Sequence, residues 1–201
     1  MSWIKRILFA ESTGRLRRIY ERVCGPSGQL DNILTAHSLR PHTLEGHLAL
    51  YKNTLHHGAN TLTKSFLETV GVYVSALNGC RYCVEHHFTG LKRLLGDDAM
   101  AERIRKALES NVLETVFNLR EQVALRYVRT LTQAPNALIE QDVHDMRQVG
   151  YDDGQILEIN QVAAYFSYAN RTVLGLGVKA AGELLGLSPG DASDPENMVH
   201  E

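Results

Sequence analysis

Apolar residues recur at steps of three and four along most of the chain, which is the spacing of an amphipathic α-helix. Alternating runs of β-branched residues, which would indicate strands, do not occur. The pattern therefore predicts an all-α fold. Turn residues divide the chain into expected helices within residues 1–24, 30–39, 41–57, 61–77, 80–95, 98–108, 113–133, 137–149 and 153–178.

Several helix boundaries are marked by residues with a specific physical effect. Pro41 disfavours helix in the residue before it and suits the first turn of the helix that it begins. Gly150 is expected as a left-handed cap. Thr61 or Thr63 is expected to cap a helix that ends at Asn78-Gly79, where the chain can turn back on itself.

Two stretches of the chain are almost free of charge, and each contains one glutamate. Glu68 lies in the first stretch and Glu158, 90 residues later, lies in the second. The same offset aligns three further identities, which are Leu67 with Leu157, Val72 with Val162 and Arg81 with Arg171. We interpret this echo as a diverged duplication of a helical unit, in which Glu158 is structural or contacts another subunit.

The duplication suggests how the domain is organised. Residues 1–187 are expected to form a single helical domain, with a redox half at about 41–109 and a degenerate half at about 113–187. Only the first half contains the cysteine pair, because Cys80 aligns with an asparagine in the second. The polar, turn-rich tail at 188–201 is expected to be mobile or to lie at an interface.

Composition excludes several classes of protein. The chain has 201 residues, of which 44% are hydrophobic, and a formal charge of -2 that offers no broad basic surface to nucleic acid. No stretch approaches the roughly 18 consecutive apolar residues of a membrane span. Glu11 and Glu21 interrupt the basic, apolar start, which favours a folded N-terminal helix over a targeting peptide. Three cysteines do not make a secreted disulfide framework, so a cytoplasmic location is expected.

The chemistry-bearing residues gather in the segment ETVGVYVSALNGCRYCVEHH, residues 68–87. Cys80, Cys83 and His87 lie at i, i+3 and i+7, on one face of the helix expected there. Cys80 would stand at the helix N-terminus, where free N–H groups and the helix dipole stabilise a thiolate. His87, one turn after Cys83, can accept or relay its proton.

Glu68 precedes the turn at residues 78–79 by about as many helical positions as His87 follows it. At about 1.5 Å of rise per residue, the two side chains differ in height by roughly one helical turn if the chain reverses there. Glu68 is therefore expected to contact His87, directly or through water, and to fix its tautomer.

The pattern of Glu68, Cys80-Arg-Tyr-Cys83 and His87 resembles the signature of AhpD-type alkylhydroperoxidases, within the carboxymuconolactone decarboxylase superfamily. The segments SYANRTVLGLGV and NIL…HSLRPHTLEGH resemble the peroxidase-related branch, so the likeness covers most of the chain. The resemblance implies an all-helical bundle that assembles into homo-oligomers.

The resemblance also implies a thiol-dependent peroxidase. Cys83 would be oxidised by a hydroperoxide to sulfenic acid, Cys80 would close the disulfide, and His87 and Glu68 would relay protons. No tightly bound cofactor is implied, because an external dithiol, in well-studied members a lipoylated partner protein, reduces the disulfide. Tyr82 departs from the family pattern, which often has a second relay histidine at this position, so the proton path is expected to differ.

Other interpretations of the motif stay open at the level of sequence. The cysteines can be inert core residues, or can form a zinc site with His86 and His87 in a non-enzymatic, redox-sensing assembly module. Single-helix spacing is a poor match to zinc-finger patterns. Lactone decarboxylation is a further alternative, although decarboxylases of the superfamily generally lack this C-x-x-C pair.

The remaining chemistry-bearing residues have simpler expectations. The histidines of the segment before the central helix are expected at solvent or interface positions: His42, His47, His56 and His57. His86 should point away from His87 and is the weaker relay candidate. Cys24 is expected to be a buried or incidental thiol. Three aromatic residues are expected in the core or in a pocket wall: Tyr165, Phe166 and Tyr168.

Overall fold

The computed structural model of the chain describes residues 2–24, 28–189, 194 and 197–200. Within these ranges the fold is all-α, as predicted, and contains nine α-helices and no β-sheet. The helices are α1 (Gly14–Val23), α2 (Asn32–Ala36), α3 (Pro41–Tyr51), α4 (Lys64–Leu77), α5 (Arg81–Leu95), α6 (Asp98–Ser110), α7 (Leu119–Gln133), α8 (Glu140–Gln148) and α9 (Asp153–Gly175).

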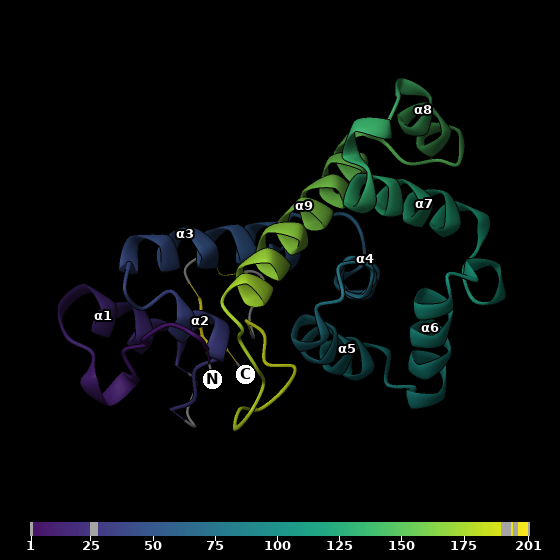
Figure 1. Cartoon of the computed structure of the whole chain (residues 1–201). Helices are drawn as coiled ribbons and strands as arrows, with labels where there is room; N and C mark the ends of the chain where they lie inside the picture. Colours follow the sequence, from purple (N-terminus) through teal and green to yellow (C-terminus); the bar gives the residue numbers. More distant parts are fainter. Residues whose placement is uncertain (1, 25–27, 190–193, 195–196, 201) are drawn as a thin grey trace.

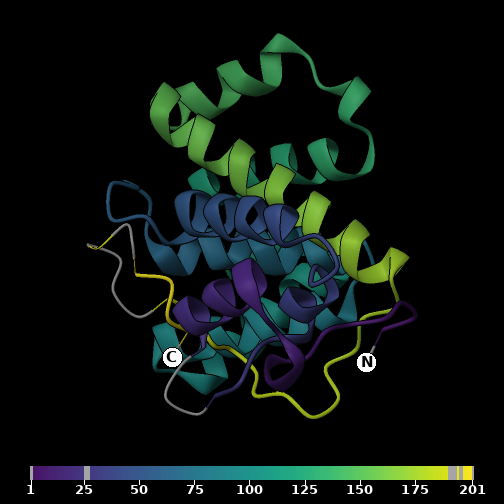
Figure 2. The same cartoon turned by 90° about the vertical axis from the view of Figure 1, so that its left-hand side faces the viewer.

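Helix α4 is the centre of the fold, and it packs against α5, α6, α7 and α9. It is buried on almost every side, which fits a sequence whose only charge between residues 65 and 80 is Glu68. Helix α9 crosses the middle of the molecule, with α1 to α3 at one end and α7 and α8 at the other (Figures 1 and 2).

A glycine allows α4 and α9 to approach each other closely. A Cβ atom at Gly71 on α4 would lie 2.3 Å from the ring of Phe166 on α9, which is far inside van der Waals contact. The ring of Phe166 therefore occupies the space that any other residue at position 71 would need. This contact sets the separation of the two helices that flank the redox segment.

The local signals before the redox segment behave as the sequence predicts. Thr63 caps α4, and its side-chain oxygen accepts a hydrogen bond from the N–H of Phe66. The helix ends at Asn78, and Gly79 follows with a φ of +67°, in the left-handed region that favours glycine. Helix α5 then runs back along α4 with Cys80 as its N-cap residue.

Two predicted helices begin later than expected. The N-terminal helix starts at Gly14, after a short 3₁₀ turn at Phe9–Glu11, because backbone groups before it bond to distant partners. Ile7 donates its N–H to Ser38 Oγ at 2.9 Å, and its carbonyl accepts from the Tyr20 hydroxyl. The helix expected at 113–133 starts at Leu119, where Asn118 and Glu121 form a capping box.

The segment expected as one helix over 41–57 also changes form along its length. Helix α3 ends at Tyr51, and the next five residues, Lys52–His56, form one π-helical stretch. Such widened turns shift the side chains that follow them around the helix axis. This shift matters for the histidines of the segment.

The described part of the tail, which was expected to be mobile or to lie at an interface, packs against helices of the same chain. The Lys52 ammonium donates hydrogen bonds to the carbonyls of Asp194 and Asn197. His200 pairs with Pro189 in an isolated β-bridge and donates its backbone N–H to Val23 at 3.1 Å. Residues 190–193, 195, 196 and 201 of the predicted tail lie outside the described residues.

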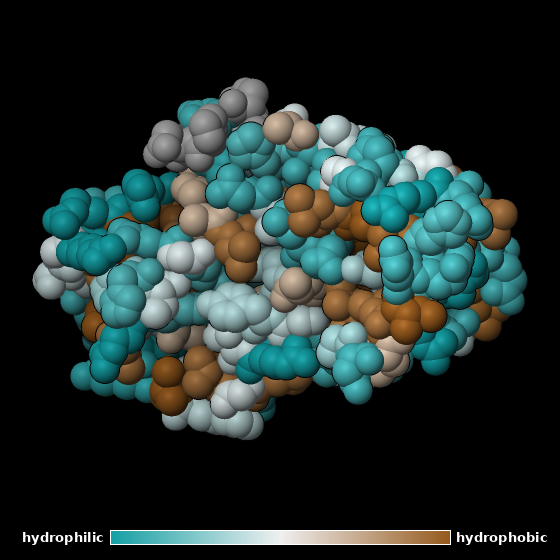
Figure 3. All heavy atoms as spheres, turned by 90° about the horizontal axis from the view of Figure 1, so that it is seen from above, coloured by the Kyte–Doolittle hydropathy of each residue, from teal (hydrophilic) through white to brown (hydrophobic). Residues whose placement is uncertain are grey.

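The described helices include none that is both long and apolar enough to cross a bilayer. The face seen in Figure 3 mixes hydrophilic and hydrophobic side chains, and hydrophobic ones gather in several places toward the end that holds α7 and α8. The most exposed large apolar residues of that end are Leu119 and Ile139.

Candidate active site

The two cysteines of the C-x-x-C motif lie at the start of α5 with their sulfur atoms in contact. Cys80 is the N-cap residue and Cys83 lies in the first turn, so the helix spacing brings both sulfurs to one face. Their Sγ atoms are 2.7 Å apart, and both residues are free thiols. A disulfide needs a separation of about 2.05 Å, so a small movement would close the bond.

The sulfur contact separates the acidities of the two thiols. The hydrogen bond with Cys83 lowers the pKa of the Cys80 thiol. The same hydrogen bond, together with burial, raises the pKa of the Cys83 thiol well above its ordinary value. Asn170 of α9 is a further hydrogen-bond partner that lowers the pKa of both thiols. The pair therefore loses its first proton from Cys80 and retains the second on Cys83.

Glu68 and His87 make the direct contact that the sequence predicts. Glu68 Oε2 lies 2.8 Å from His87 Nδ1, and the carboxylate is buried, with 3% of its surface exposed. A carboxylate only accepts hydrogen bonds, so Nδ1 of the imidazole carries the proton in this contact. The neutral ring then has its lone pair on Nε2, available to a group in the cavity beside it.

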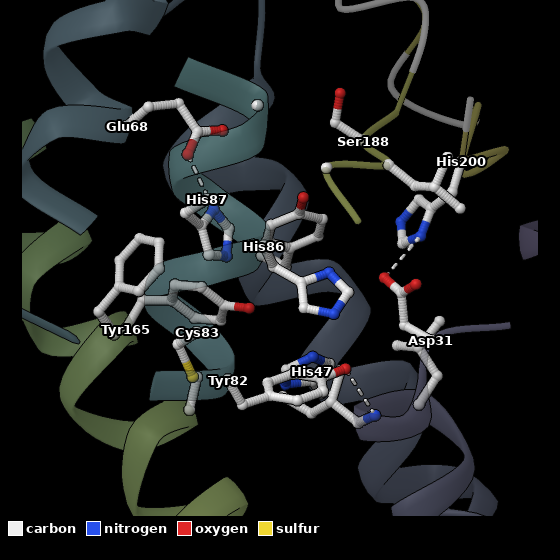
Figure 4. Close-up of a pocket in the computed structure, with 18 residues that line it drawn as sticks. Asp31, His47, Glu68, Tyr82, Cys83, His86, His87, Tyr165, Ser188 and His200 are labelled. Atoms are coloured by element: carbon white, nitrogen blue, oxygen red, sulfur yellow. Dashed lines mark hydrogen bonds and ion pairs between the residues drawn. The ribbon is translucent and has the colours of Figure 1, made fainter. Parts of the chain in front are cut away.

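Cys83 and the Glu68–His87 pair line one cavity of about 50 Å³ (Figure 4). A cavity needs at least about 10–15 Å³ to hold one water molecule, so this cavity has room for a few waters or a small hydroperoxide. Tyr165 and Phe166 of α9 form part of its wall, as the sequence predicts for core or pocket residues. Cys80 does not line the cavity, although it touches the sulfur that does.

Asp31 and His200 face the same cavity across from Glu68, and His86 lines it as well (Figure 4). Asp31 and His200 approach to 3.8 Å, and His86 Nε2 lies 3.1 Å from Glu183 Oε1. Burial raises the pKa of Asp31 to about 6 and lowers the pKa of His200 to about 4. His86 thus lines the cavity with His87, which the expected divergence of the two rings does not suggest.

The prediction of solvent or interface positions is wrong for two of the four histidines. His47 and His56 are buried, with 3% and 1% of their surfaces exposed, whereas His42 is exposed and His57 is half-buried. His47 stacks on His37 with ring centroids 4.8 Å apart. His47 is also one of the residues that line the cavity.

Burial favours the neutral form of these histidines. It lowers the pKa of His47 to about 3 and that of His56 well below the ordinary value. Within the described residues, neither ring nitrogen of His56 has a hydrogen-bond partner, and the same holds for Nδ1 of His47 and Nε2 of His200. Each is a buried polar group whose cost must be offset by packing elsewhere.

Tyr82 lies where the family pattern often places a relay histidine. Its hydroxyl accepts a hydrogen bond from the N–H of Ile33 at 3.2 Å, and its ring lies against His86 with centroids 4.5 Å apart. Tyr82 is therefore a fixed part of the cavity wall. Burial is the main cause that raises the pKa of its hydroxyl well above the ordinary value, which makes it a poor proton donor.

Three other predicted residues take supporting positions. Glu158 is structural, since its carboxylate accepts hydrogen bonds from the N–H groups of Thr61 and Leu62 at 2.8 and 3.0 Å. The prediction of a core or pocket-wall position is wrong for Tyr168, which is 40% exposed and whose hydroxyl lies 3.3 Å from His37 Nε2. Cys24 is a half-buried free thiol.

The histidine and acidic side chains of the site do not form a metal centre. Among the described residues, no group of three or more His, Cys, Asp or Glu side chains is arranged to hold a metal ion. The zinc arrangement of Cys80, Cys83, His86 and His87 is not present, because His86 and His87 turn to separate carboxylates.

Sequence reasoning missed Asn170 and the Asp31, Glu183 and His200 group. Asn170 is fully buried in α9, where its amide donates to Ser75 Oγ at 3.1 Å and accepts from Asn78 at 2.9 Å. An amide within the apolar second half of this helix, at the position that aligns with Cys80, was a usable signal. Residues 31, 183 and 200 carry no such signal, because only the fold brings their segments together.

A search with the sequence finds no matching family model and no matching curated protein. Solved structures do match. A peroxidase-related protein described as an alkylhydroperoxidase AhpD core, from Ralstonia eutropha JMP134, has a TM-score of 0.78 at 23% identity, covering 90% of this chain and 93% of that one. A peroxidase-related protein from Silicibacter sp. TM1040 has a TM-score of 0.77 at 25% identity, covering 90% and 92%.

The fold also occurs in a protein with a different named activity. A debrominase, solved in complex with a tribromopyrrole, has a TM-score of 0.64 at 16% identity and covers 84% of each chain. Similarity at this level shows a common fold. The chain therefore has the fold of AhpD-like, peroxidase-related proteins, in agreement with the likeness of its motif to the carboxymuconolactone decarboxylase superfamily.

Proposed function

We propose that this chain is a thiol-dependent peroxidase that reduces a hydroperoxide at Cys83. The observation that carries the proposal is one cavity that brings Cys83, whose sulfur touches that of Cys80, together with an oriented base. The sulfurs are 2.7 Å apart, and His87 Nδ1 lies 2.8 Å from Glu68. A fold shared with peroxidase-related proteins supports an antioxidant role.

In the first step, the Cys83 sulfur attacks the distal oxygen of the hydroperoxide. The O–O bond breaks, Cys83 becomes a sulfenic acid, and the alcohol leaves. Since the pKa of Cys83 is raised, its thiol needs a base, and the free Nε2 of His87 can take the proton and return it to the departing alkoxide. Glu68 stabilises the imidazolium that forms between these transfers.

In the second step, Cys80 attacks the sulfenic sulfur of Cys83. The S–O bond breaks, a disulfide forms, and water leaves with the proton that the site supplies. The lowered pKa of Cys80 favours its thiolate form, which is the nucleophile of this step. The different acidities of the thiols therefore match two different tasks, attack on peroxide with base assistance and unassisted closure of the disulfide.

The cycle is completed by two electrons from an external dithiol, which returns both cysteines to thiols. The site has no tightly bound cofactor in this proposal. Thiol–disulfide turnover of this kind requires a reducing compartment, so we place the protein in the cytoplasm.

The test of the proposal uses the two serine variants and a sulfenic-acid trap, dimedone. Trypsin cleaves after Arg81 and so separates Cys80, in residues 65–81, from Cys83, in residues 82–92. After one equivalent of hydroperoxide, Cys80→Ser should carry dimedone on residues 82–92, because no second thiol resolves the sulfenic acid. Cys83→Ser should carry little on residues 65–81, because Cys80 does not line the cavity.

A dimedone adduct that forms on Cys80 at least as fast as on Cys83 would contradict the assignment of Cys83 as the cysteine that peroxide oxidises. No adduct on either residue, with both variants folded by circular dichroism, would contradict peroxidase chemistry altogether. An inert core pair or an assembly module predicts this second outcome.

A further inference from the structure

Closure of the disulfide in the proposed cycle needs a proton that neither cysteine supplies. Cys80 attacks as a thiolate, and the oxygen that leaves the sulfenic sulfur of Cys83 becomes water only if it gains a proton. This oxygen comes from the hydroperoxide, so it is on the side of Cys83 that lines the cavity. A proton donor for the step must therefore face the same cavity.

Most titratable side chains of the cavity are poor donors of this proton. Burial lowers the pKa of His47 and His200 to about 3 and 4, which favours neutral rings that hold no acidic proton near neutral pH. Burial is also the main cause that raises the pKa of three hydroxyls well above the ordinary value, those of Tyr51, Tyr82 and Tyr165.

The two histidines of α5 are each engaged with a carboxylate. His86 Nε2 lies 3.1 Å from Glu183, and His87 Nδ1 lies 2.8 Å from Glu68. A carboxylate only accepts hydrogen bonds, so the nitrogen that carries the proton points to it in each pair. Asp31 is the remaining carboxyl among the residues that line the cavity.

The carboxyl of Asp31 is buried but is not engaged in this way. Its residue is 8% exposed and lines the cavity across from Glu68 (Figure 4). Asp31 is the N-cap residue of α2, where an aspartate commonly accepts from the N–H groups of the first turn, yet its side chain makes no capping hydrogen bond. Its ion pair with His200, at 3.8 Å, is too long for a hydrogen bond.

Other side chains take the N–H groups at the start of α2 in place of Asp31. The Tyr82 hydroxyl accepts from the N–H of Ile33 at 3.2 Å, and the Glu183 carboxylate accepts from the N–H of Asn32. Tyr82 is the residue that departs from the family pattern. The side chain that replaces a relay histidine thus caps a neighbouring helix and leaves an acid of that helix free to face the cavity.

We propose that Asp31 is the acid of the second step, which protonates the oxygen that leaves Cys83 while Cys80 closes the disulfide. The proposal rests on the proposed function, because it needs a sulfenic acid on Cys83. The proton passes directly or through one of the few waters for which the cavity has room.

The atoms and charges of the step balance. The Cys80 thiolate forms the S–S bond, the S–O bond of Cys83 breaks, and the O–H bond of Asp31 breaks as its proton joins the departing hydroxide to form water. Asp31 is left as a carboxylate. When the external dithiol later gives two electrons and two protons, one proton returns to Asp31 and the other to the Cys83 thiol.

The surroundings of Asp31 suit an acid that works near neutral pH. Burial and the charge of Glu183 raise its pKa to about 6, and the charges of His86 and His87 act in the opposite sense. Besides Cys83 and the three tyrosines, the titratable groups that face it come from α3, α4, α5 and the C-terminal segment: His47, Glu68, His86, His87, Glu183 and His200. The protonated fraction of Asp31 therefore falls about tenfold for each pH unit above that pKa.

The test measures disulfide closure against trapping by dimedone in Asp31→Asn, an isosteric change that removes the acidic proton. A sulfenic acid on Cys83 either forms the disulfide between residues 65–81 and 82–92 or leaves dimedone on residues 82–92. The ratio of disulfide to adduct reports the rate of closure independently of the first step. At pH 5.5, Asp31→Asn should lower this ratio by about tenfold or more.

Two controls isolate the role of Asp31. Asp97→Asn changes another N-cap aspartate, which caps α6 through the N–H of Met100, and should leave the ratio within about twofold of wild type, because asparagine caps as well. Cys80→Ser, with and without Asp31→Asn, cannot close the disulfide and so measures trapping alone. Circular dichroism checks the fold of each variant.

The pH profile distinguishes an acid from a carboxyl that only supports the structure. The wild-type ratio divided by that of Asp31→Asn should be largest at pH 5.5 and should fall toward one by pH 8, as Asp31 loses its proton. The titrations of Cys80 and of dimedone occur with both proteins and cancel in this quotient. Equal ratios at pH 5.5, or a deficit of the same size at every pH, would overturn the proposal.

Failure of the proposed function gives a different result. Without a sulfenic acid on Cys83, the Cys80→Ser protein carries no dimedone on residues 82–92, and both proposals are contradicted. With dimedone there and no difference between wild type and Asp31→Asn, only the role of Asp31 is contradicted.

Discussion

At the scale of single residues, the role of each glutamate depends on the group from which its carboxylate accepts a hydrogen bond. Glu68 accepts from the imidazole of His87, and Glu158, its counterpart 90 residues later, accepts from the backbone of Thr61 and Leu62. Each carboxylate holds a neighbouring segment in place. Only the first one acts on a group that can move a proton.

The pair of glutamates provides a matched test of the proton relay. Glu68→Gln should lower the rate of sulfenic acid formation by roughly a hundredfold, because the amide no longer stabilises a protonated imidazole. Glu158→Gln should leave this rate within about twofold and affect only thermal stability. Single-turnover oxidation with limiting hydroperoxide measures both, and equal rates in the two variants would remove Glu68 from the mechanism.

The four residues of the redox motif could be predicted because their relation is local. Spacing on one helix places Cys80, Cys83 and His87 together, and a single turn at residues 78–79 returns Glu68 to them. His47, His200 and Asp31 could not be placed in this way. Their positions depend on contacts between distant segments, such as His47 with Tyr165 and His200 with Asp31, and the periodicity of apolar residues does not record such contacts.

At the scale of elements, the contact between α4 and α9 holds the relay in position. Phe166 fills the space above Gly71 and meets the ring of His87 edge-on, with centroids 4.5 Å apart. The packing of two helices is therefore connected to the orientation of the base. The ring of Phe166 makes both contacts, with Gly71 at the close approach of α4 and α9 and with the imidazole of His87.

Gly71→Ala should destabilise the protein by about 1–3 kcal/mol, because the added methyl group displaces Phe166. The displaced ring should also disturb His87 and slow peroxide oxidation. The matched control is Gly46→Ala on α3, where a Cβ meets nothing within 4 Å and helix propensity favours alanine by about 0.5–1 kcal/mol. Urea unfolding of both variants tests this, and no loss of stability in Gly71→Ala would contradict the described packing.

Helix boundaries were predictable where a residue acts on its own backbone. Thr63 as a cap, Gly79 after a helix end and Gly150 with a φ of +93° each do so. The start of the chain was not predictable, because its apolar and basic residues fit a helix by pattern. Its backbone instead finds partners in distant segments, such as the hydrogen bond from the Trp3 N–H to the Leu176 carbonyl.

At the scale of the whole molecule, buried titratable groups make stability depend on pH. The lowered pKa values of His47 and His200, about 3 and 4, and that of His56 mean that the unfolded state binds more protons below the ordinary histidine pKa of 6.5. Stability therefore decreases as the pH is lowered through that range. Asp31 opposes this, because a pKa raised to about 6 adds stability that is lost as pH rises through that value.

Three histidines outweigh one carboxylate, so Tm should fall as pH is lowered from about 6.5 to 4. His56→Phe keeps the edge-on ring contact with Tyr51 and removes one protonation, so it should make this fall less steep. The exposed His42→Gln is the control, and its slope should match that of wild type. Calorimetry at a series of pH values measures the slopes, and a Tm that rises on acidification would contradict the assigned shifts.

The central claim is that one hydroperoxide converts two neighbouring thiols into one disulfide. Peptide mass spectrometry of the wild-type protein after one equivalent of hydroperoxide tests it most directly. The result that we predict is a disulfide that joins residues 65–81 to residues 82–92, with loss of two hydrogen atoms and Cys24 left as a thiol. Cys80 and Cys83 both recovered as free thiols, in folded protein, would contradict the account.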